Sequence, residues 1–332
     1  MSLVPNISII IPTYNRANYL AKAITCCQAQ QGSFEIIISD NCSTDNTADI
    51  VRPFLNDPRI RYYRNDRNLG MMGNWKKCIY EYAHADWFVL MSDDDYFTDP
   101  DYLKDAWAAI TTHQPKLVYG GGRIVNQQTD QSVNIELPFN GLVSGQDVFQ
   151  SRGTVKPQDF ILSNIVFNKH DAIRLGFPRN PLNLCSDSEL FLNLCLEGQV
   201  FVINRNVIDY TLHGNNFITK VSQVKELYTS NTEYLIYPYL YAQRLGTPSQ
   251  VIDAFLQNTH LHANIVNALI ALKVNNASWH REYRQQLEQL APTLLKNVES
   301  SFLYFKRNLK ATLFRAKYKK KHTLRELSVN DY

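Results

Sequence analysis

Short apolar runs that alternate with helical patterns constrain the fold of this chain more than any other feature. Runs typical of buried strands lie at residues 7–11, 34–39, 60–63 and 87–91. Between them, apolar residues recur at helical spacing at 19–27, 46–54 and 74–83. Strands that alternate with helices predict an α/β fold, with a mostly parallel sheet and helices on both faces.

Polar residues follow three of these strands, at the point where each strand ends. They are Pro12, Thr13, Tyr14 and Arg16 after the first strand, Asp40 and Asn41 after the second, and Asp93, Asp94 and Asp95 after the last. The carboxyl ends of parallel strands meet at one edge of the sheet, where open α/β sheets bind ligands. These side chains are therefore predicted to converge there.

The three consecutive aspartates carry the strongest chemical signal. Burial of like charges is costly unless a positive charge lies among them. Mg²⁺ or Mn²⁺ accepts such oxygen ligands and also holds substrate phosphates. The alternative is an acidic, solvated turn, because aspartate is common in turns.

Four segments together carry a resemblance to a known family. They lie at residues 10–16, 35–47, 68–70 and 92–95. They resemble the motifs of the family 2 glycosyltransferases, over about residues 5–215. The resemblance implies the GT-A fold, which is Rossmann-like with a mostly parallel sheet flanked by helices. The spacing at 70–74 is similar to the abequosyltransferase-like branch of surface-polysaccharide enzymes.

The resemblance implies a role for each matching residue. Pro12, Thr13, Tyr14 and Arg16 line the base and ribose pocket, Asp40 and Asn41 contact the base, and Asn68, Gly70 and Asn74 complete the sugar-donor site. Asp93 and Asp94 contact the ribose and the donor sugar, while Asp95 binds Mn²⁺ or Mg²⁺. His213 begins a His-Gly-x-Asn pattern that is frequent in the family, and it completes the metal site or contacts the diphosphate. Which of the three aspartates is the metal ligand stays open. The family often has two acids where Asp40 and Asn41 stand, so Asn41 is a departure that leaves the choice among uracil, thymine and cytosine open. UDP is the first expectation, with dTDP and CDP as alternatives.

A second constellation lies at residues 185–194, which read as the start of a helix. Ser186 is a suitable N-cap, and Glu189 three residues later predicts a capping box. The resemblance implies that Asp187 is the catalytic base. Ser186 replaces the acid that usually precedes it, so Glu189 is a rival base. Asp187 could also serve only the helix N-terminus.

The implied reaction is metal-dependent and inverting. A sugar passes from a nucleotide-diphosphate sugar to a hydroxyl of a glycan or lipid-linked acceptor, in bacterial surface polysaccharide biosynthesis. A sugar-1-phosphate nucleotidyltransferase is an alternative, although residues 12–16 lack the Gly-rich loop of such enzymes. The other alternative is a catalytically inactive nucleotide-binding or membrane scaffold.

The chain is predicted to divide into three parts. Residues 1–221 form the GT-A domain, with a donor half at about 1–115 and an acceptor half at about 116–221. Glycines then become rare and apolar residues recur at helical spacing, at 228–245, 251–272 and 283–295. This pattern predicts a helical appendage at 222–297, followed by a basic amphipathic tail at 298–332. Within the acceptor half, Gly120, Gly121 and Gly122 predict close backbone approach to a ligand or a tight turn.

The tail indicates where the protein works. Residues 301–325 contain nine lysines and arginines, no acid, and interspersed large apolar residues. Such a segment is typical of a helix on an anionic membrane surface, where each basic residue contributes about 1 kcal/mol. Nucleic acid is the rival partner and a solvated tail the third interpretation; no other segment resembles a nucleic-acid module.

The rest of the composition agrees with a peripheral protein of the cytoplasm. The six cysteines have neither framework nor metal spacing, which predicts reduced thiols. No apolar run reaches the roughly 18 residues that span a bilayer, and no signal peptide precedes residue 7. We therefore expect a location on the inner face of the cell membrane; the sequence does not indicate the oligomeric state.

Overall fold

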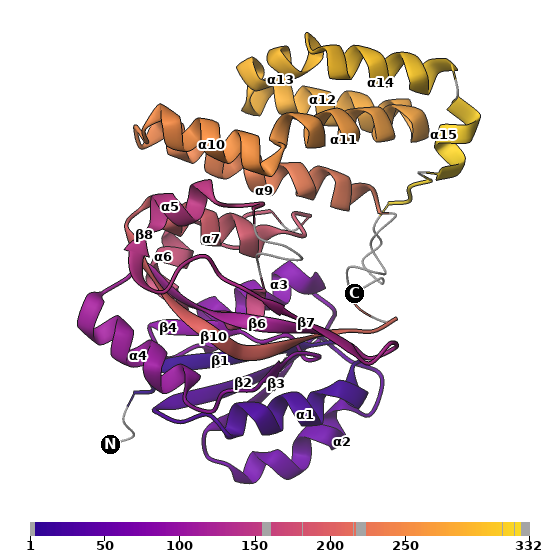
Figure 1. Ribbon diagram of the computed structural model, residues 1–332. Coiled ribbons are helices and arrows are strands. Elements are labelled where there is room, and N and C mark those ends of the chain that lie inside the picture. Colours follow the sequence, from indigo (N-terminus) through magenta and orange to yellow (C-terminus); the bar gives the residue numbers. More distant parts are fainter. Residues whose placement is uncertain are drawn as a thin grey trace.

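The structure is a computed structural model that describes residues 4–154, 161–180, 182–214, 216, 224–313, 315–321 and 323–326. A curled sheet forms its lower half, with helices below it and a thick helical layer above (Figure 1). The strand order is β3 (Ile60–Arg64), β2 (Phe34–Asp40), β1 (Ile7–Thr13), β4 (Trp87–Leu90), β9 (Ile165–Asn168), β6 (Leu117–Asn126), β10 (Gln199–Leu212) and β5 (Tyr96–Phe97). The fold class predicted from the sequence is confirmed.

The first four strands are parallel, as the alternation of strands and helices predicts. The second half of the sheet is mixed, because β9 runs antiparallel to both β4 and β6, and β5 runs antiparallel to β10. The polar segment after β6 forms a hairpin, in which β7 (Gln131–Ile135) pairs with β6. β8 (Gly141–Ser144) pairs with β10.

Three of the four described helices that follow in the first half have predicted counterparts, and each differs from its predicted bounds at the ends. They are α1 (Ala17–Gln28), α2 (Thr47–Val51), α3 (Gly70–Lys77) and α4 (Tyr102–His113). Helix α2 ends early in a 3-10 turn (Arg52–Asn56), since Pro53 has no N–H to continue the helical bonds. Helix α3 begins four residues before the predicted start at Asn74 and ends in a π-type turn (Cys78–Tyr82).

The glycine run lies inside strand β6 and not in a ligand loop. A Cβ on Gly121 would stand 2.7 Å from the carbonyl oxygen of Arg205, and one on Gly122 would stand 2.8 Å from Ile161 Cδ1. These glycines form no tight turn, and the backbone that approaches Gly121 closely is that of β10.

The upper layer is helical, as predicted, and it contains more breaks than the periodicity indicates. Its helices are α9 (Lys225–Arg244), α10 (Ser249–Thr259), α11 (Leu261–Asn275), α12 (Ala277–Leu290), α13 (Pro292–Glu299), α14 (Phe302–Leu313) and α15 (Arg315–Lys321). The predicted helix at 251–272 is interrupted at His260, which has a left-handed φ of 52°. The predicted helix at 283–295 is interrupted at Ala291, before Pro292.

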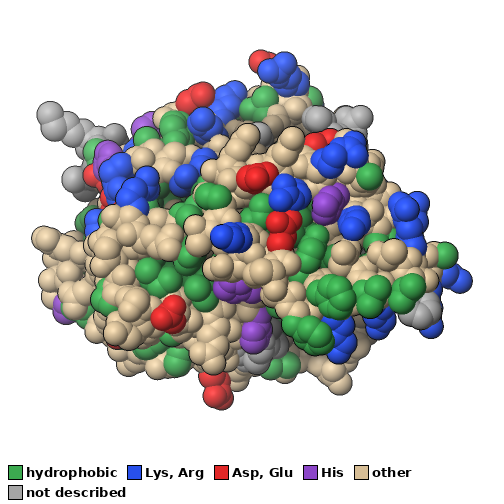
Figure 2. Space-filling view, turned by 90° about the horizontal axis from the view of Figure 1, so that it is seen from above, with side chains coloured by type: hydrophobic (Ala, Val, Ile, Leu, Met, Phe, Trp, Pro, Cys, Tyr) green, Lys and Arg blue, Asp and Glu red, His purple; other side chains and the backbone are tan. Residues whose placement is uncertain are grey.

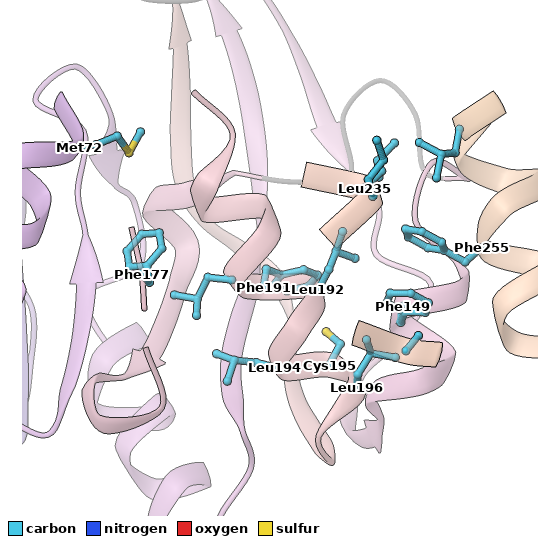
Figure 3. Packing of buried hydrophobic residues seen from close by; sticks show 14 of the residues in the cluster. Met72, Phe149, Phe177, Phe191, Leu192, Leu194, Cys195, Leu196, Leu235 and Phe255 are labelled. Atoms are coloured by element: carbon cyan, nitrogen blue, oxygen red, sulfur yellow. The ribbon is translucent and has the colours of Figure 1, made fainter. Parts of the chain in front are cut away.

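Two hydrophobic cores cover the two faces of the sheet. Ile9 and Ile11 of β1 pack into the core beneath helices α1 and α4, whereas Ile10 faces the other core. This second core continues without a break from the sheet into α7 (Ser186–Leu196), α9 and α11. Figure 3 shows Phe191 and Leu192 of α7 between Met72 and Leu235, and Phe149 beside Phe255.

The predicted divisions of the chain do not coincide with breaks in this core. The proposed boundary at residue 221 lies outside the described residues. The tail is held against the helical layer, with Ala311 and Leu324 buried in the second core and Leu303 partly buried against it. Among the described helices, none combines the length and the apolar character that crossing a membrane requires.

Candidate active site

The aspartates after β4 form a buried cluster and not the solvated turn that was their alternative. Asp93, Asp94 and Asp95 are 7%, 8% and 1% exposed. Arg16 spans two of them: its Nε donates to Asp93 Oδ1 at 3.1 Å, and its Nη2 donates to Asp94. Thr13 Oγ1, from the end of β1, donates to Asp93 Oδ2 at 2.7 Å. The strand ends therefore converge, and Arg16 supplies positive charge.

The burial of this cluster changes its proton affinity. Burial raises the pKa of Asp93 to about 6, although the charge of Arg16 acts against the rise. Burial, followed by the charge of Asp94, raises the pKa of Asp95 to about 8. The charge of Arg16 alone therefore does not offset the burial of these two carboxylates. A bound cation is favoured under this condition.

His213 closes the site from the end of β10. Its Nε2 lies 3.1 Å from Asp94 Oδ2, and its ring stacks on the Tyr19 ring with 4.6 Å between centroids. The same Tyr19 ring lies under the Arg16 guanidinium, at 4.5 Å from the centroid. Asn216, three residues after His213, donates from Nδ2 to Asp94 Oδ2 at 3.4 Å. His213 thus lies beside Asp94.

The pair of Asp94 and His213 suits a divalent cation. Two ligands about 2.1 Å from an octahedral ion and at right angles to each other lie about 3 Å apart, close to the 3.1 Å between Asp94 Oδ2 and His213 Nε2. A carboxylate and a neutral imidazole are acceptable ligands for Mn²⁺. In the described residues no cluster of three or more His, Cys, Asp or Glu forms a metal cage. An ion held here would need substrate phosphates to complete its shell, as Mg²⁺ commonly does.

Asp95 accepts its hydrogen bonds from a different pair of residues. Its Oδ2 accepts a hydrogen bond from Ser163 Oγ at 2.8 Å, and its Oδ1 accepts one from the Thr211 backbone N–H at 3.3 Å. The structure therefore brings Asp94, rather than Asp95, beside His213.

The residues after β2 form a second part of the same edge. Asp40 is 1% exposed; its Oδ1 accepts from the Ser43 N–H and its Oδ2 from the Tyr62 hydroxyl, both at 2.7 Å. Asn41 N–H donates to the Thr13 carbonyl at 2.9 Å, which ties the ends of β1 and β2 together. Pro12 and Tyr14 are partly exposed beside this junction.

The other predicted sugar-donor residues divide into two kinds. Asn68 Oδ1 accepts from the Asn41 side chain at 2.7 Å and from the Gly70 N–H at 2.8 Å, so this loop is bound to the end of β2. Asn74 is only 2% exposed and is held by Ser39 on β2, whose hydroxyl donates to Asn74 Oδ1 at 2.7 Å. Asn74 thus braces helix α3 against the sheet from the interior.

Asp187 lies in the first turn of α7. The predicted capping box is wrong, since Cys185 is the N-cap and Ser186 lies inside the helix without a side-chain cap bond. Asp187 Oδ1 accepts the Ser188 N–H at 2.8 Å. Burial raises the pKa of Asp187 to about 6, while that N–H and the charge of Arg152 act against the rise. A carboxylate with this pKa is ionised at neutral pH and still able to take a proton.

Glu189, the rival base, forms an ion pair and a hydrogen bond with neighbouring side chains. Its Oε1 lies 3.0 Å from Arg179 Nη2, and its Oε2 accepts from Asn183 Nδ2 at 3.0 Å. Burial raises the pKa of Glu189 to about 7. Asp187, in contrast, shares its surroundings with the acidic cluster. After burial itself, the charges of Asp95, Asp94 and Asp187 raise the pKa of Tyr210.

Some residues of the site were not found from the sequence. Tyr19 looks like part of an amphipathic helix, and Ser163 and Arg152 have no motif around them. Asn216 had a signal, because it completes the His-Gly-x-Asn pattern that begins at His213. The other three are brought in by the fold alone.

Comparison with known proteins gives the same assignment as the motifs. The profile described as "Glycosyl transferase family 2" matches residues 8–177. TarS of Staphylococcus aureus, a poly(ribitol-phosphate) beta-N-acetylglucosaminyltransferase, is 32% identical over 109 residues, which span 32% of this chain and 19% of TarS. The succinoglycan biosynthesis protein ExoO of Rhizobium meliloti is 32% identical over 52% of this chain and 53% of its own.

A third relative is matched over more of its length. The dolichyl N-acetyl-alpha-D-glucosaminyl phosphate 3-beta-D-2,3-diacetamido-2,3-dideoxy-beta-D-glucuronosyltransferase of Methanococcus voltae is 25% identical over 68% of both chains. Among solved structures, TarS residues 1–349 in complex with UDP-GlcNAc superpose with a TM-score of 0.66 at 15% identity, covering 96% of this chain and 92% of that one. A Pyrobaculum calidifontis mannosyltransferase in complex with GDP-Man and Mn²⁺ has a TM-score of 0.54 at 16% identity, covering 94% and 88%. At these identities the likeness shows the fold.

Proposed function

The chain belongs to glycosyl transferase family 2, and from that premise we propose that it is a metal-dependent, inverting glycosyltransferase. It moves a sugar from a nucleotide-diphosphate sugar to a hydroxyl of a glycan or lipid-linked acceptor, in the synthesis of a bacterial surface polysaccharide. The convergence of Arg16, Asp94 and His213 at the carboxyl edge of the sheet carries this proposal.

The relatives support the choice of substrates. Poly(ribitol-phosphate) is named as the acceptor of TarS, and a dolichyl-linked sugar phosphate as that of the Methanococcus enzyme. TarS was solved with UDP-GlcNAc, and the Pyrobaculum enzyme with GDP-Man and Mn²⁺. We assign UDP as the first nucleotide, with dTDP and CDP as alternatives, and Mn²⁺ or Mg²⁺ as the cation.

We assign the metal-ligand role to Asp94 and His213, in place of Asp95, for which the family resemblance implies that role. A divalent cation bound there offsets the negative charge of the departing diphosphate. Thr13 and Arg16 hold the carboxylate of Asp93, so that it is positioned before substrate arrives. Pro12, Tyr14, Asp40, Asn41, Asn68 and Gly70 keep their assignment to nucleotide binding, whereas the burial of Asn74 favours a supporting role.

Asp187 acts as the general base. A sugar hydroxyl is a weak nucleophile at neutral pH, and a carboxylate within hydrogen-bond reach can accept its proton as attack proceeds. The oxygen bonds to the anomeric carbon from the side opposite the diphosphate, which leaves with the electron pair of the broken bond. The configuration at that carbon is therefore inverted.

A thermal-shift panel tests the sugar-donor site. Uridine, thymidine, cytidine and guanosine diphosphates and their sugars are compared with and without Mn²⁺. Ligand at about 100 times its Kd stabilises the folded state by about 2.7 kcal/mol, so a shift of several degrees is expected for uridine nucleotides, and only with metal.

Release of the nucleotide in the presence of an acceptor then distinguishes an enzyme from an inactive scaffold. Turnover with the nucleotide sugar that gave the shift supports the proposal. A chain that binds no nucleotide under any of these conditions contradicts it, and a nucleotide exchange reaction with a sugar 1-phosphate would favour the nucleotidyltransferase instead.

A further inference from the structure

One face of helix α14 leaves four large apolar side chains in solvent. Phe302, Phe305, Leu309 and Leu313 are 76%, 63%, 48% and 66% exposed. Spacings of three, four and four residues place them on one side of a helix. They are four of the ten exposed large hydrophobic residues among those described, so the exposure is concentrated on this helix. We call this set the α14 ridge.

The opposite side of α14 packs against the rest of the protein. Ala311 is 3% exposed, and Tyr304 packs against the same hydrophobic core as helix α11. Lys273 of α11 donates from Nζ to Asn308 Oδ1 at 2.9 Å. Because these contacts fix the orientation of the helix, the α14 ridge cannot turn inward without exposing side chains that are now buried.

Positive charge lies beside and beyond the ridge. Lys306 and Lys310 are exposed on α14, and Arg315, Lys317, Lys319, Lys320 and Lys321 are exposed on α15. Within the described part of the chain, none of these seven has a carboxylate at ion-pair distance. Figure 2, seen from the side of the helical layer, shows a row of hydrophobic side chains with lysines and arginines along its margin.

We propose that the α14 ridge and these basic residues dock the protein on an anionic lipid bilayer. The apolar side chains enter the boundary between headgroups and acyl chains, and the lysines reach the headgroup phosphates. This combination is what an interfacial helix needs, since one apolar face and one basic margin each contribute to binding. The proposal rests on the ridge itself and not on the identity of the transferred sugar.

Other occupants explain only part of the surface. A second copy seated on the same face would bring seven unneutralised cations against seven others, which is unfavourable. A double-helical nucleic acid would use the lysines and leave the four apolar side chains in water, because phosphate contacts carry no apolar component. A bilayer with anionic headgroups would contact both the apolar side chains of the α14 ridge and the basic residues beside them.

Vesicle flotation with the full chain tests the proposal. The vesicles are phosphatidylcholine alone, or phosphatidylcholine mixed with phosphatidylglycerol. We expect binding to the mixed vesicles, at least about tenfold weaker partition to the neutral ones, and a decrease with added salt. Phe305→Ser with Leu309→Ser should weaken partition at least about tenfold, and Lys306→Gln with Lys310→Gln severalfold.

Matched controls come from exposed residues elsewhere. Val133→Ser with Leu245→Ser removes apolar groups of similar exposure, and Lys76→Gln with Lys104→Gln removes the same charge; neither should change partition. Melting temperatures of all variants confirm that they fold. Turnover of a soluble acceptor should be unchanged in the ridge variants, which separates this proposal from the catalytic one.

Several outcomes would overturn the docking surface. Equal flotation of the wild type and the ridge variants would remove the α14 ridge from membrane binding, as would the absence of any flotation with anionic vesicles. Sedimentation without lipid that shows a dimer, dissociated by Phe305→Ser with Leu309→Ser, would assign the ridge to self-association. Binding of single-stranded RNA that exceeds vesicle binding and ignores the ridge substitutions would assign the basic margin to nucleic acid.

Discussion

Arg16 shows how much a single residue depends on its surroundings. In the sequence it is one arginine in a turn, for which a solvated side chain is the simple expectation. In the structure it neutralises part of a buried cluster, with Nε on Asp93 and its guanidinium over Tyr19. Removal of Arg16 would leave the buried carboxylates of Asp93 and Asp94 without its positive charge, which is the costly way to break such a cluster.

The first prediction concerns Asp187. Asp187→Asn should lower kcat by about 10²–10⁴-fold, because the amide cannot accept the proton of the attacking hydroxyl. Binding of the nucleotide sugar, measured by calorimetry, should be nearly unchanged. In the wild type, kcat/KM should rise with pH through about 6, since the base works only when ionised and burial raises the pKa of Asp187 to about 6.

Glu189→Gln is the matched control for Asp187→Asn. The amide keeps the contact to Asn183, so the fold should persist, and the rise of kcat/KM near pH 6 should remain. If Glu189→Gln abolished that limb while Asp187→Asn retained it, the base would be Glu189, in which burial raises the pKa to about 7.

The second prediction concerns the cation. Asp94→Asn and His213→Ala should each weaken Mn²⁺ affinity, measured by calorimetry with UDP present, by at least about tenfold. Asp95→Asn should weaken it less, because the hydrogen bonds of Asp95 run to Ser163 and Thr211, whereas Asp94 lies beside His213. If Asp95→Asn weakened Mn²⁺ affinity more than Asp94→Asn does, the metal ligand would be Asp95, as the resemblance implies.

Among the secondary-structure elements, apolar periodicity predicts where helices lie, whereas local backbone conformation and proline decide where they are interrupted. Apolar periodicity predicted helices at 228–245, 251–272 and 283–295, but it did not predict the breaks at His260 and Ala291, which follow from local backbone conformation and Pro292. Strand β10 is 14 residues long, from Gln199 to Leu212. The second part of β10 pairs with β6 beyond the register shifts in this strand pair. This is a long-range contact, and the polar residues of β10 do not predict it.

The third prediction tests the packing of β6 against β10. Gly121→Ala should destabilise the fold by about 1–3 kcal/mol, because the new methyl group would stand 2.7 Å from the Arg205 carbonyl oxygen and backbone cannot easily move. Urea denaturation measures the effect. Gly198→Ala is the control, since its Cβ would meet only the flexible Lys116 side chain at 3.3 Å. Equal midpoints for both variants would mean that β10 has more freedom than the structure indicates.

For the molecule as a whole, the sheet and the helical layer behave as one hydrophobic unit. A single core runs from Ile10 in β1 to Val298 in α13, and Phe149 stacks on Phe255 across the two regions at 4.1 Å between centroids. The tail closes this layer, as Lys225 N–H donates to the Arg325 carbonyl at 2.7 Å. The division into domain, appendage and tail therefore describes composition better than it describes packing.

The fourth prediction follows from that continuity. Deletion of residues 301–332 should lower the free energy of unfolding by at least about 3 kcal/mol, because Leu324 and Ala311 are buried and Leu303, Tyr304 and Tyr318 partly so. Chemical denaturation measures this loss. Lys306→Gln with Lys310→Gln should leave the midpoint unchanged. An unaltered midpoint after the deletion would show that the tail is dispensable for folding.

The sequence by itself determined the fold class and the edge of the sheet at which polar residues gather. These follow from local information: strand and helix periods are set by neighbouring residues, and parallel topology brings the strand ends together. Only the tertiary structure decided which carboxylate lies beside His213, that Asn74 is interior, and that four apolar residues of α14 face solvent while its other side is buried. Those outcomes depend on contacts between residues far apart in the chain, which no local pattern encodes.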